Sequence, residues 1–166
     1  MNDTVLIGAL LVAALVVVAA AVRAARRPRV PPSPYRRKAS LFTRDERRFY
    51  DALRQVTGDR FLVFAQMRLI DLVEVPRGSA GSPFWFAKVR HKHVDFVLCD
   101  RETATPVLAI ELDGASHESD VQRQRDVEKD AVLRQAGLPL LRVASRKGGY
   151  PPKAVAAAIN QVLAAG

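Results

Sequence analysis

Two apolar segments that carry acidic side chains constrain the fold of this chain most strongly. Residues 93–98 and 106–112 each have the length and composition of a strand, and residues 100–105 between them form a turn, so the sequence predicts a β-hairpin. Residues 107–112 are apolar on both faces except for Glu111, which indicates a strand inside a sheet. A carboxylate in such a strand is unfavourable unless it binds a metal ion, a proton or a cation.

The chain from residue 40 onward predicts an α/β fold, with a mixed β-sheet core flanked by helices. A strand–helix–strand crossover over residues 107–143 favours this mixed sheet with flanking helices. Residues 68–75 fit either a short helix or an extended segment, residues 76–83 fit a loop, and the aromatic residues 84–86 are expected to pack onto the core. The predicted helices start at the capping residue Thr43 and span residues 120–135 and 151–165, and the remaining strands span 60–67 and 138–143.

Cysteine content and charge narrow the functional classes. The single cysteine, Cys99, excludes an intrachain disulfide and a cysteine-based zinc cluster, and its apolar surroundings predict a core position. The formal net charge of +9 is typical of nucleic-acid-binding proteins. However, the first 38 residues have a net charge of +6 and the remaining 128 residues only +3. The charge of the folded part therefore says little about nucleic-acid binding.

Residues 4–22 form an uncharged run of 19 residues, long enough to cross a bilayer as a helix. A cleaved signal peptide is one alternative, but such peptides carry positive charges before a shorter apolar core, whereas here the positive charges follow the run. A buried core helix is another alternative, but nothing obvious covers its apolar surface. We expect residues 1–22 to be a single transmembrane anchor in the inner (cytoplasmic) membrane, with the N-terminus outside.

The residues after the anchor divide into two parts. Residues 23–39 predict a basic, proline-rich juxtamembrane linker, and residues 40–166 predict the cytosolic domain. The basic linker residues are explained by topology and by attraction to anionic lipid headgroups, with a nucleic-acid tether as the alternative. The membrane, reached through residues 4–22, is therefore an expected partner, and no oligomeric state is predicted.

Three carboxylates are expected to converge at the ends of the hairpin strands. Glu111 and Asp113 share a face of their strand because side chains alternate, and Asp95 lies on the neighbouring strand. Clustered carboxylates repel one another, so Asp95, Glu111 and Asp113 are candidate ligands of Mg²⁺ or Mn²⁺, which can activate water for phosphodiester hydrolysis. Gly114 allows a sharp exit from the strand, so that His117 can fold back as a general base, a phosphate contact or a metal ligand.

Basic side chains on the following helix are candidate substrate contacts. Arg125 and Lys129 are four residues apart and share a helix face, from which they can contact a phosphate. A solvated helix face is the alternative for this pair. The other basic residues that could extend the site, each with solvent exposure as its alternative, are His91, His93, Arg146 and Lys147. Arg142 ends a buried strand and is a candidate partner of one of the acids.

These residues resemble the restriction-endonuclease-like superfamily. They are similar to the bacterial family catalogued as domain of unknown function 2726 and, in plan, to the very-short-patch-repair endonucleases. The resemblance covers roughly residues 40–145 and rests on Asp95, Glu111-Leu112-Asp113-Gly114 with His117, Arg125-Asp126 and residues 136–143. It implies a mixed sheet with helices on both sides and metal-dependent cleavage of DNA. It also implies that Asp95 and Glu111 are the metal ligands, with Glu46 as an additional acid; a capping box with Thr43 is the alternative role of Glu46.

The sequence departs from the superfamily signature at one position. The signature is acid, spacer, acid-x-Lys, and Asp113 stands where the lysine is expected. Lys129 on the next helix and His117 are candidates for the missing role, so they join the three acids as candidate catalytic residues. The departure bears on activity more than on the fold.

Three functions are compatible with these features. The leading expectation is a membrane-anchored, metal-dependent nuclease that hydrolyses DNA phosphodiester bonds. The missing lysine favours an alternative, a catalytically inactive nuclease-fold module that binds nucleic acid or a protein partner at the membrane. A membrane-associated structural protein without a nucleic-acid role is the third.

Overall fold

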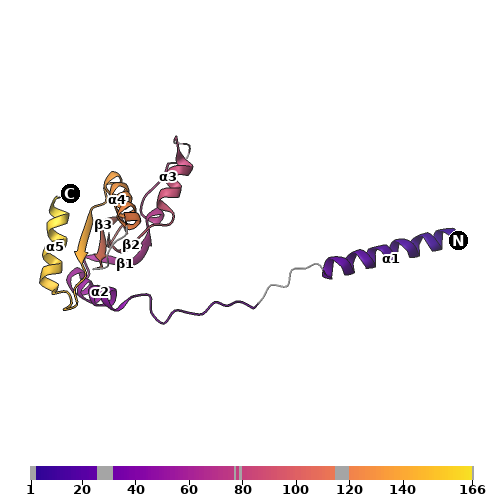
Figure 1. The fold of residues 1–166 in the computed structure, drawn as a ribbon, viewed down its shortest axis with the longest axis horizontal. Helices are drawn as coiled ribbons and strands as arrows, with labels where there is room; N and C mark the ends of the chain where they lie inside the picture. The colour runs from indigo at the N-terminus through magenta and orange to yellow at the C-terminus, as the bar shows by residue number, and fades with distance from the viewer. Residues whose placement is uncertain (1–2, 26–31, 77, 79, 115–119, 166) are drawn as a thin grey trace. The chain divides into compact units, whose positions relative to one another are not determined.

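The chain divides into two compact units, Met1–Ala39 and Ser40–Gly166 (Figure 1). The computed structural model describes residues 3–25, 32–76, 78, 80–114 and 120–165, except for the side chains of residues 4, 5, 24, 25 and 120–125. All buried apolar side chains of the described residues lie between Phe49 and Ile159, so the hydrophobic core belongs to the second unit. A chain of residues 39–166 therefore retains this core and is expected to fold alone.

Helix α1 (Asp3–Ala25) is the helix of the first unit. Its residues Leu6–Arg23 are long and apolar enough to cross a membrane, and none of them is buried. Length and composition alone are weak evidence for a span, because a signal sequence near the N-terminus has the same properties. The identity of the membrane and the orientation of the helix stay predictions.

The second unit is built around a four-stranded mixed sheet with the order β1-β2-β3-β4. Its strands are β1 (Phe61–Arg68), β2 (His93–Asp100), β3 (Pro106–Asp113) and β4 (Leu140–Ala144). β2 is antiparallel to β1 and β3, whereas β3 and β4 are parallel. The predicted hairpin, the interior position of its second strand and the mixed sheet are thus confirmed.

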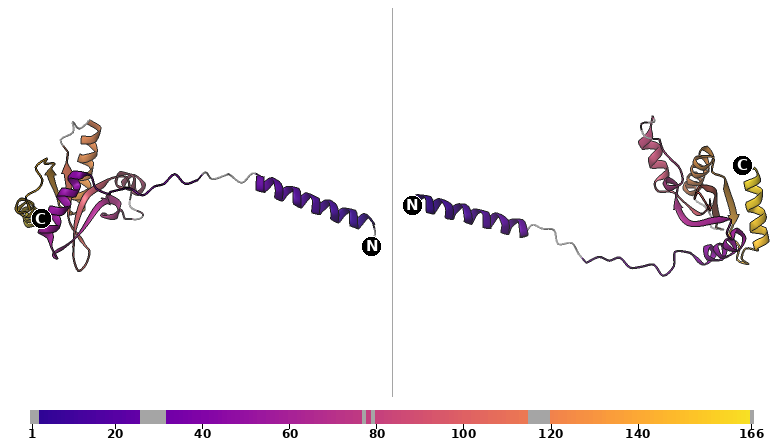
Figure 2. Two further views of the ribbon diagram at one scale, coloured as in Figure 1. Left: turned by 90° about the horizontal axis from the view of Figure 1, so that it is seen from below. Right: turned by 180° about the vertical axis from the view of Figure 1, so that it is seen from behind.

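Helices cover both faces of this sheet (Figures 1 and 2). Helices α2 (Arg44–Thr57) and α5 (Pro152–Ala165) pack against each other on one face. The 3-10 helix η1 (Leu69–Asp71), α3 (Ser82–Val89) and α4 (Asp120–Gln135) lie on the other face. As predicted, α4 is the crossover between the parallel strands β3 and β4.

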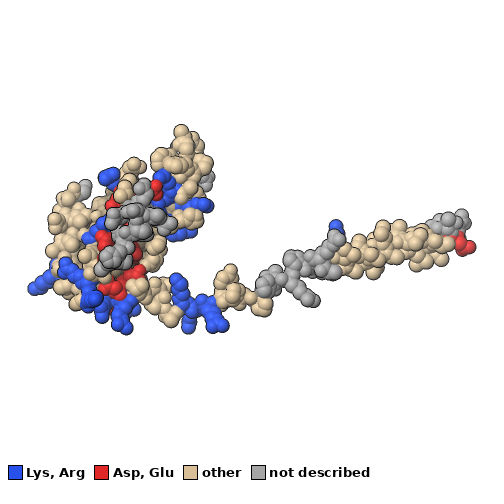
Figure 3. All heavy atoms as spheres, viewed as in Figure 1, with Lys and Arg blue, Asp and Glu red and all other residues tan. Residues whose placement is uncertain are grey.

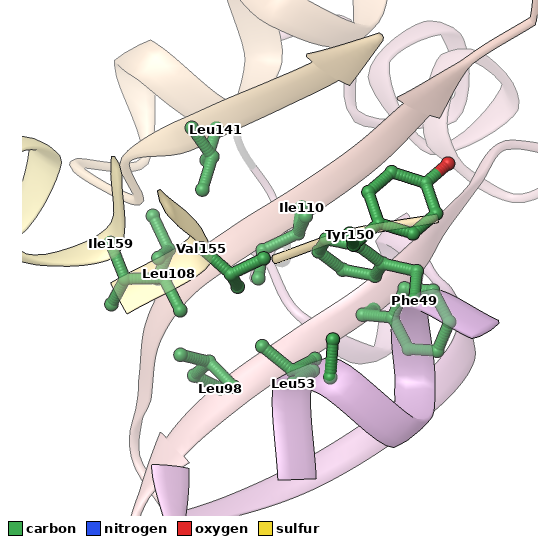
Figure 4. Packing of buried hydrophobic residues seen from close by; sticks show 11 residues of the cluster. Phe49, Leu53, Leu98, Leu108, Ile110, Leu141, Tyr150, Val155 and Ile159 are labelled. Atoms are coloured by element: carbon green, nitrogen blue, oxygen red, sulfur yellow. The ribbon is translucent and has the colours of Figure 1, made fainter. Parts of the chain in front are cut away.

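Alternating side chains on the central strands divide the core into two clusters. In the α2–α5 cluster, side chains of the sheet meet side chains of α2 and α5 (Figure 4); its members include Phe49, Leu53, Phe96, Leu98, Leu108, Ile110, Val155 and Ile159. In the α4 cluster, on the other face, they include Leu69, Val89, Val94, Val97, Cys99, Ala109 and Leu133. The predicted core position of Cys99 is therefore confirmed.

Helix α2 begins where the sequence predicts. The backbone N–H of Glu46 donates to Thr43 Oγ1 (3.3 Å), and the backbone N–H of Thr43 donates to Glu46 Oε2 (2.6 Å). These two bonds form a capping box, which satisfies N–H groups that have no partner within the helix.

Helix α3 differs from the sequence-based expectation. Instead of continuing the loop, Ser82 and Pro83 open a helix, in which proline is tolerated because the first turn needs no N–H donor. Phe84, Trp85 and Phe86 are 56%, 48% and 47% exposed. Their predicted packing onto the core is therefore wrong, and Val89 is the buried residue of α3.

Strand β4 starts two residues later than predicted. Gly137 has a φ of 69°, and the N–H of Leu138 donates to the carbonyl of Leu133 (3.0 Å). This is the hydrogen bond of a Schellman C-cap, so the backbone of Leu138 closes α4 instead of pairing with β3.

Candidate functional site

Strands β2 and β3 separate at the end of the sheet where the acidic residues lie. Their last paired residues at this end are Phe96 and Ile110. Beyond them, the Asp95 carboxylate accepts a hydrogen bond from the backbone N–H of Leu112 (Oδ2–N 2.8 Å). This bond replaces a backbone ladder bond and directs the Asp95 side chain toward β3.

The side chains of β2 on either side of Asp95 point to opposite faces of the sheet. Phe96 packs in the α2–α5 cluster and Val94 in the α4 cluster, although residues two apart in a strand ordinarily share a face. Strand β2 therefore turns over at Asp95, and that side chain is left outside both clusters. Gln66 occupies the facing position of β1 and has a φ of 53°.

Gln66 holds a second acid near the site. Its left-handed backbone costs about 1–2 kcal/mol in a residue with a side chain, so neighbouring contacts must stabilise it. The Gln66 amide donates to Glu46 Oε1 (2.8 Å), while Glu46 Oε2 accepts the capping bond from Thr43. Both oxygens of Glu46 are thus engaged, and the capping role of this residue is confirmed.

Glu111 and Lys129 form an ion pair inside the domain. Lys129 Nζ lies 2.7 Å from Glu111 Oε1, and each residue is 8% exposed. The distance is that of a charge-assisted contact, and Lys129 is the partner of Glu111 Oε1 that the described residues provide. Lys129 Nζ also lies 3.6 Å from Asp126 Oδ1, one helical turn earlier. A lysine of α4 thus reaches the acid of β3.

The two carboxylates of β2 and β3 influence each other. Burial raises the pKa of Glu111 to about 7, against the opposing effect of Lys129 and with a smaller contribution from the charge of Asp95. Burial also raises the pKa of Asp95; the N–H of Leu112 opposes this, and the charge of Glu46 adds to it. Asp95 and Glu111 are therefore an interacting pair of partly buried acids.

Asp113 has a different partner. Arg142 lies opposite Glu111 on β4 and donates to Asp113 (Nη1–Oδ1 2.7 Å) and to Asp130 of α4 (Nη2–Oδ1 2.7 Å). Partial burial lowers the pKa of Arg142, but the hydrogen bond to Asp130 and the charge of Asp113 outweigh it and raise the pKa above its usual value. The expectation that Arg142 pairs with an acid is confirmed.

The remaining predicted residues have varied positions. His117 lies outside the described residues, and Arg125 belongs to α4 with its side chain outside the description. His91 and His93 are exposed, as are Arg146 and Lys147 in the loop after β4. The structure thus brings Asp95, Glu111 and Lys129 together and places Asp113 in an ion pair beside them.

The fit of these residues to a divalent cation is mixed. No group of three or more His, Cys, Asp or Glu side chains in the described part of the chain is arranged to hold a metal ion. Glu111, however, is a buried carboxylate whose Oε1 lies 2.7 Å from Lys129 Nζ, and the charge of the nearby Asp95 raises its pKa further. Two such carboxylates, together with waters, fit Mg²⁺ or Mn²⁺, whereas the bond to Arg142 makes Asp113 a less suitable ligand.

A cavity of about 330 Å³ lies elsewhere, between α3, α4 and the segment before α3. Its lining includes Val73, Trp85, Val89 and Val132 and none of the three residues of the acid site. Its surface is mainly apolar, and its charged residues are Glu74 and Lys88. The acid site therefore has the stronger chemical argument.

Two contributors to the site escape sequence reasoning. Gln66 follows an apolar strand segment, and the neighbouring sequence contains no pattern that predicts its left-handed backbone. Asp130 binds Arg142, twelve residues away, through a contact that depends on how α4 packs beside β4. Asp126 gives a usable signal, because its spacing of three residues from Lys129 predicts an ion pair on one helix face.

Together, the fold and the site define a mixed α/β domain with two partly buried carboxylates next to a lysine. The sequence model of the family described as "Protein of unknown function (DUF2726)" matches residues 38–163. The chain belongs to this family, which confirms that part of the resemblance. Comparison with the curated proteins and with the solved structures finds no match.

Proposed function

We propose that the second unit is a metal-dependent nuclease with a restriction-endonuclease-like plan, and that it hydrolyses DNA phosphodiester bonds. The observation that supports this most is the meeting of Asp95 from β2, Glu111 from β3 and Lys129 from α4. Lys129 takes the place of the lysine that the acid-x-Lys signature puts at position 113.

In this proposal, Asp95 and Glu111 offer oxygen ligands to Mg²⁺ or Mn²⁺. When bound, the cation supplies Lewis acidity and lowers the pKa of a coordinated water. Lys129 neutralises part of the carboxylate charge and offers N–H donors to a phosphate oxygen that gains charge in the transition state. Arg142 keeps Asp113 in place beside this group.

The test is cleavage of plasmid and single-stranded DNA by residues 39–166 with Mg²⁺ or Mn²⁺. We expect nicking that chelation stops and that Glu111→Ala abolishes. Asp59→Ala is the matched control, because the Asp59 side chain is 99% exposed. Absence of cleavage with both metals, or full cleavage by Glu111→Ala, contradicts the proposal.

A non-catalytic module is the second candidate, and the ion pairs favour it. Lys129 and Arg142 lie within 2.7 Å of Glu111 and Asp113, so the domain itself supplies cations for both acids of β3. Tight DNA binding that is independent of metal supports this candidate, and Mg²⁺ binding that Asp95→Asn abolishes counts against it.

We also propose that α1 anchors the chain in the inner membrane with the second unit in the cytoplasm. The basic residues that follow the apolar run support this orientation.

A further inference from the structure

We propose that the loop of residues 145–150 and the first turns of α2 form a surface that binds the phosphodiester backbone of a nucleic acid. The inference rests on the proposed function and adds the place where the substrate strand lies. We call this surface the basic ledge; its cations are Arg44, Arg48, Arg146 and Lys147.

The loop of the basic ledge is fixed at several points. The N–H of Ser145 donates to the carbonyl of Asp113 (2.8 Å), so the loop starts at the end of β3. Arg48 Nη1 donates to the carbonyl of Lys147 (3.2 Å), which ties the middle of the loop to α2. A loop held in this way has a fixed backbone, and this lowers the backbone entropy lost on binding.

Asp45 of α2 is the main anchor of this loop. Its Oδ2 accepts hydrogen bonds from the hydroxyls of Ser145 and Tyr150, each at 2.6 Å. The buried Tyr150 ring also packs edge-on against Phe49, with 5.0 Å between ring centroids. Because Asp45 binds two neutral hydroxyls, the loop gains an anchor while its cations remain available.

The cations of the ledge are exposed and lack acidic partners. Arg44 and Arg48 are four residues apart on α2 and share a helix face. Among the described residues, no ion pair involves Arg44, Arg48, Arg146 or Lys147. Figure 3 shows Lys and Arg side chains gathered over α2 and the connection from β4 to α5. Exposed cations on a backbone that is held in place are suited to phosphates.

Gly148 leaves the ledge open. Its backbone has no left-handed φ, and a Cβ at this position would have no neighbour within 4 Å. The fold itself therefore does not require glycine at 148. Gly149, in contrast, has a φ of 85° and is needed for the turn. A position without a side chain next to Lys147 allows close approach of a ligand.

The ledge adjoins the acid site. Its first residue binds the last residue of β3, two positions after Glu111, and Asp45 precedes Glu46, which Gln66 holds opposite Asp95. A strand lying on the ledge can reach this end of the sheet, where the Glu111 side chain turns to Lys129 on the α4 face. This proximity favours a nucleic acid over lipid headgroups, because the neighbouring acid pair can act on a phosphodiester, whereas it contributes nothing to binding a bilayer surface.

The test measures binding separately from cleavage. Residues 39–166 are titrated onto labelled duplex DNA in EDTA, over a range of salt concentrations. We expect Arg146→Gln/Lys147→Gln to weaken binding and to reduce the slope of log K against log salt by about 2, one unit for each lost phosphate contact. Gly148→Ala should also weaken binding while the melting temperature is kept.

The matched control is Arg90→Gln/Arg134→Gln, which removes the same charge from two exposed positions, the C-cap of α3 and α4. This pair should leave DNA affinity close to that of the unchanged domain. Equal losses in both double variants, or no loss in the ledge variant, overturn the inference. So does a ledge variant that keeps DNA affinity and loses sedimentation with phosphatidylserine vesicles. DNA binding in EDTA through the ledge, without cleavage in Mg²⁺, leaves the inference standing and refutes only the nuclease.

Discussion

At the scale of single residues, burying the ion pair of Lys129 and Glu111 costs desolvation free energy. Removing two charges from water is offset only by close contact and additional hydrogen bonds. Here the contact is close, and no donor besides Lys129 reaches Glu111 Oε1 among the described residues. A pair held mainly by this one contact is costly to break, because removing either partner leaves a buried charge behind.

Lys129→Met should destabilise residues 39–166 by about 3 kcal/mol at pH 9, because it leaves the Glu111 carboxylate buried without its cation. Burial already raises the pKa of Glu111 to about 7. The variant can therefore protonate Glu111 as the pH falls, and its loss of stability should be smaller at pH 5. Urea unfolding at the two pH values measures this. An equal loss at both, or no recovery in Glu111→Gln/Lys129→Met, contradicts the account.

The sequence predicted which acidic residues of β2 and β3 lie at the site better than it predicted which side chains they contact. The acid-bearing strands and their pairing follow from local patterns. The contact of Asp113 with Arg142 joins residues 29 positions apart and depends on the parallel register of β3 and β4, which no local pattern specifies. The exchange of side-chain faces in β2 at Asp95 could not be predicted either, because regular alternation places Val94 and Phe96 on the same face.

Among the elements, Glu128 joins α4 to α3 and to the start of β2. Its carboxylate accepts hydrogen bonds from Lys88 Nζ (2.7 Å) and Lys92 Nζ (2.8 Å). The hydrogen bonds from these two lysines lower the pKa of Glu128 to about 2. The same helix also carries Lys129 at the acid site. The contacts of Glu128 therefore help to position Lys129 along β3.

Glu128→Gln should lower the melting temperature at pH 6 and have little effect at pH 2. A carboxylate with a lowered folded pKa stabilises the fold above its unfolded pKa of 4.5, and this contribution is lost as the pH falls toward 2. Thermal unfolding from pH 7 to 2 measures the difference, with exposed Glu102→Gln as the control. A difference between the unchanged domain and Glu128→Gln that persists at pH 2 would contradict this role.

Helices with amphipathic patterns and caps could be predicted well, and α3 could not. The start of α2 follows from its capping residues, and the end of α4 follows from Gly137. In α3, three consecutive aromatic residues suggested burial, which their exposure contradicts. The signal for this helix was Pro83 after Gly81 and Ser82, a helix-start pattern within a segment rich in loop residues.

At the scale of the whole molecule, the described hydrophobic core belongs to the second unit. Residues Leu6–Arg23 contribute no buried side chain, and the described core lies within residues 49–159. Removing residues 1–38 should therefore leave the melting temperature of the domain unchanged.

The full chain, expressed in a bacterial host, should stay in the membrane fraction after alkaline washing, and residues 39–166 should be soluble. Protease added to spheroplasts should leave the domain intact, because the positive charges after the apolar run favour a cytoplasmic C-terminus. A shortened, soluble chain in the periplasm would identify a signal peptide instead.

The central claim is that Asp95 and Glu111 together hold a divalent cation, and calorimetric titration of residues 39–166 with Mg²⁺ tests it most directly. Since a proton on Glu111, with its pKa of about 7, competes with the metal, affinity should rise about tenfold from pH 6 to pH 8. Asp95→Asn and Glu111→Gln should abolish binding, and Asp113→Asn should retain it. Absence of Mg²⁺ binding by the unchanged domain, or undiminished binding by Glu111→Gln, would contradict the claim.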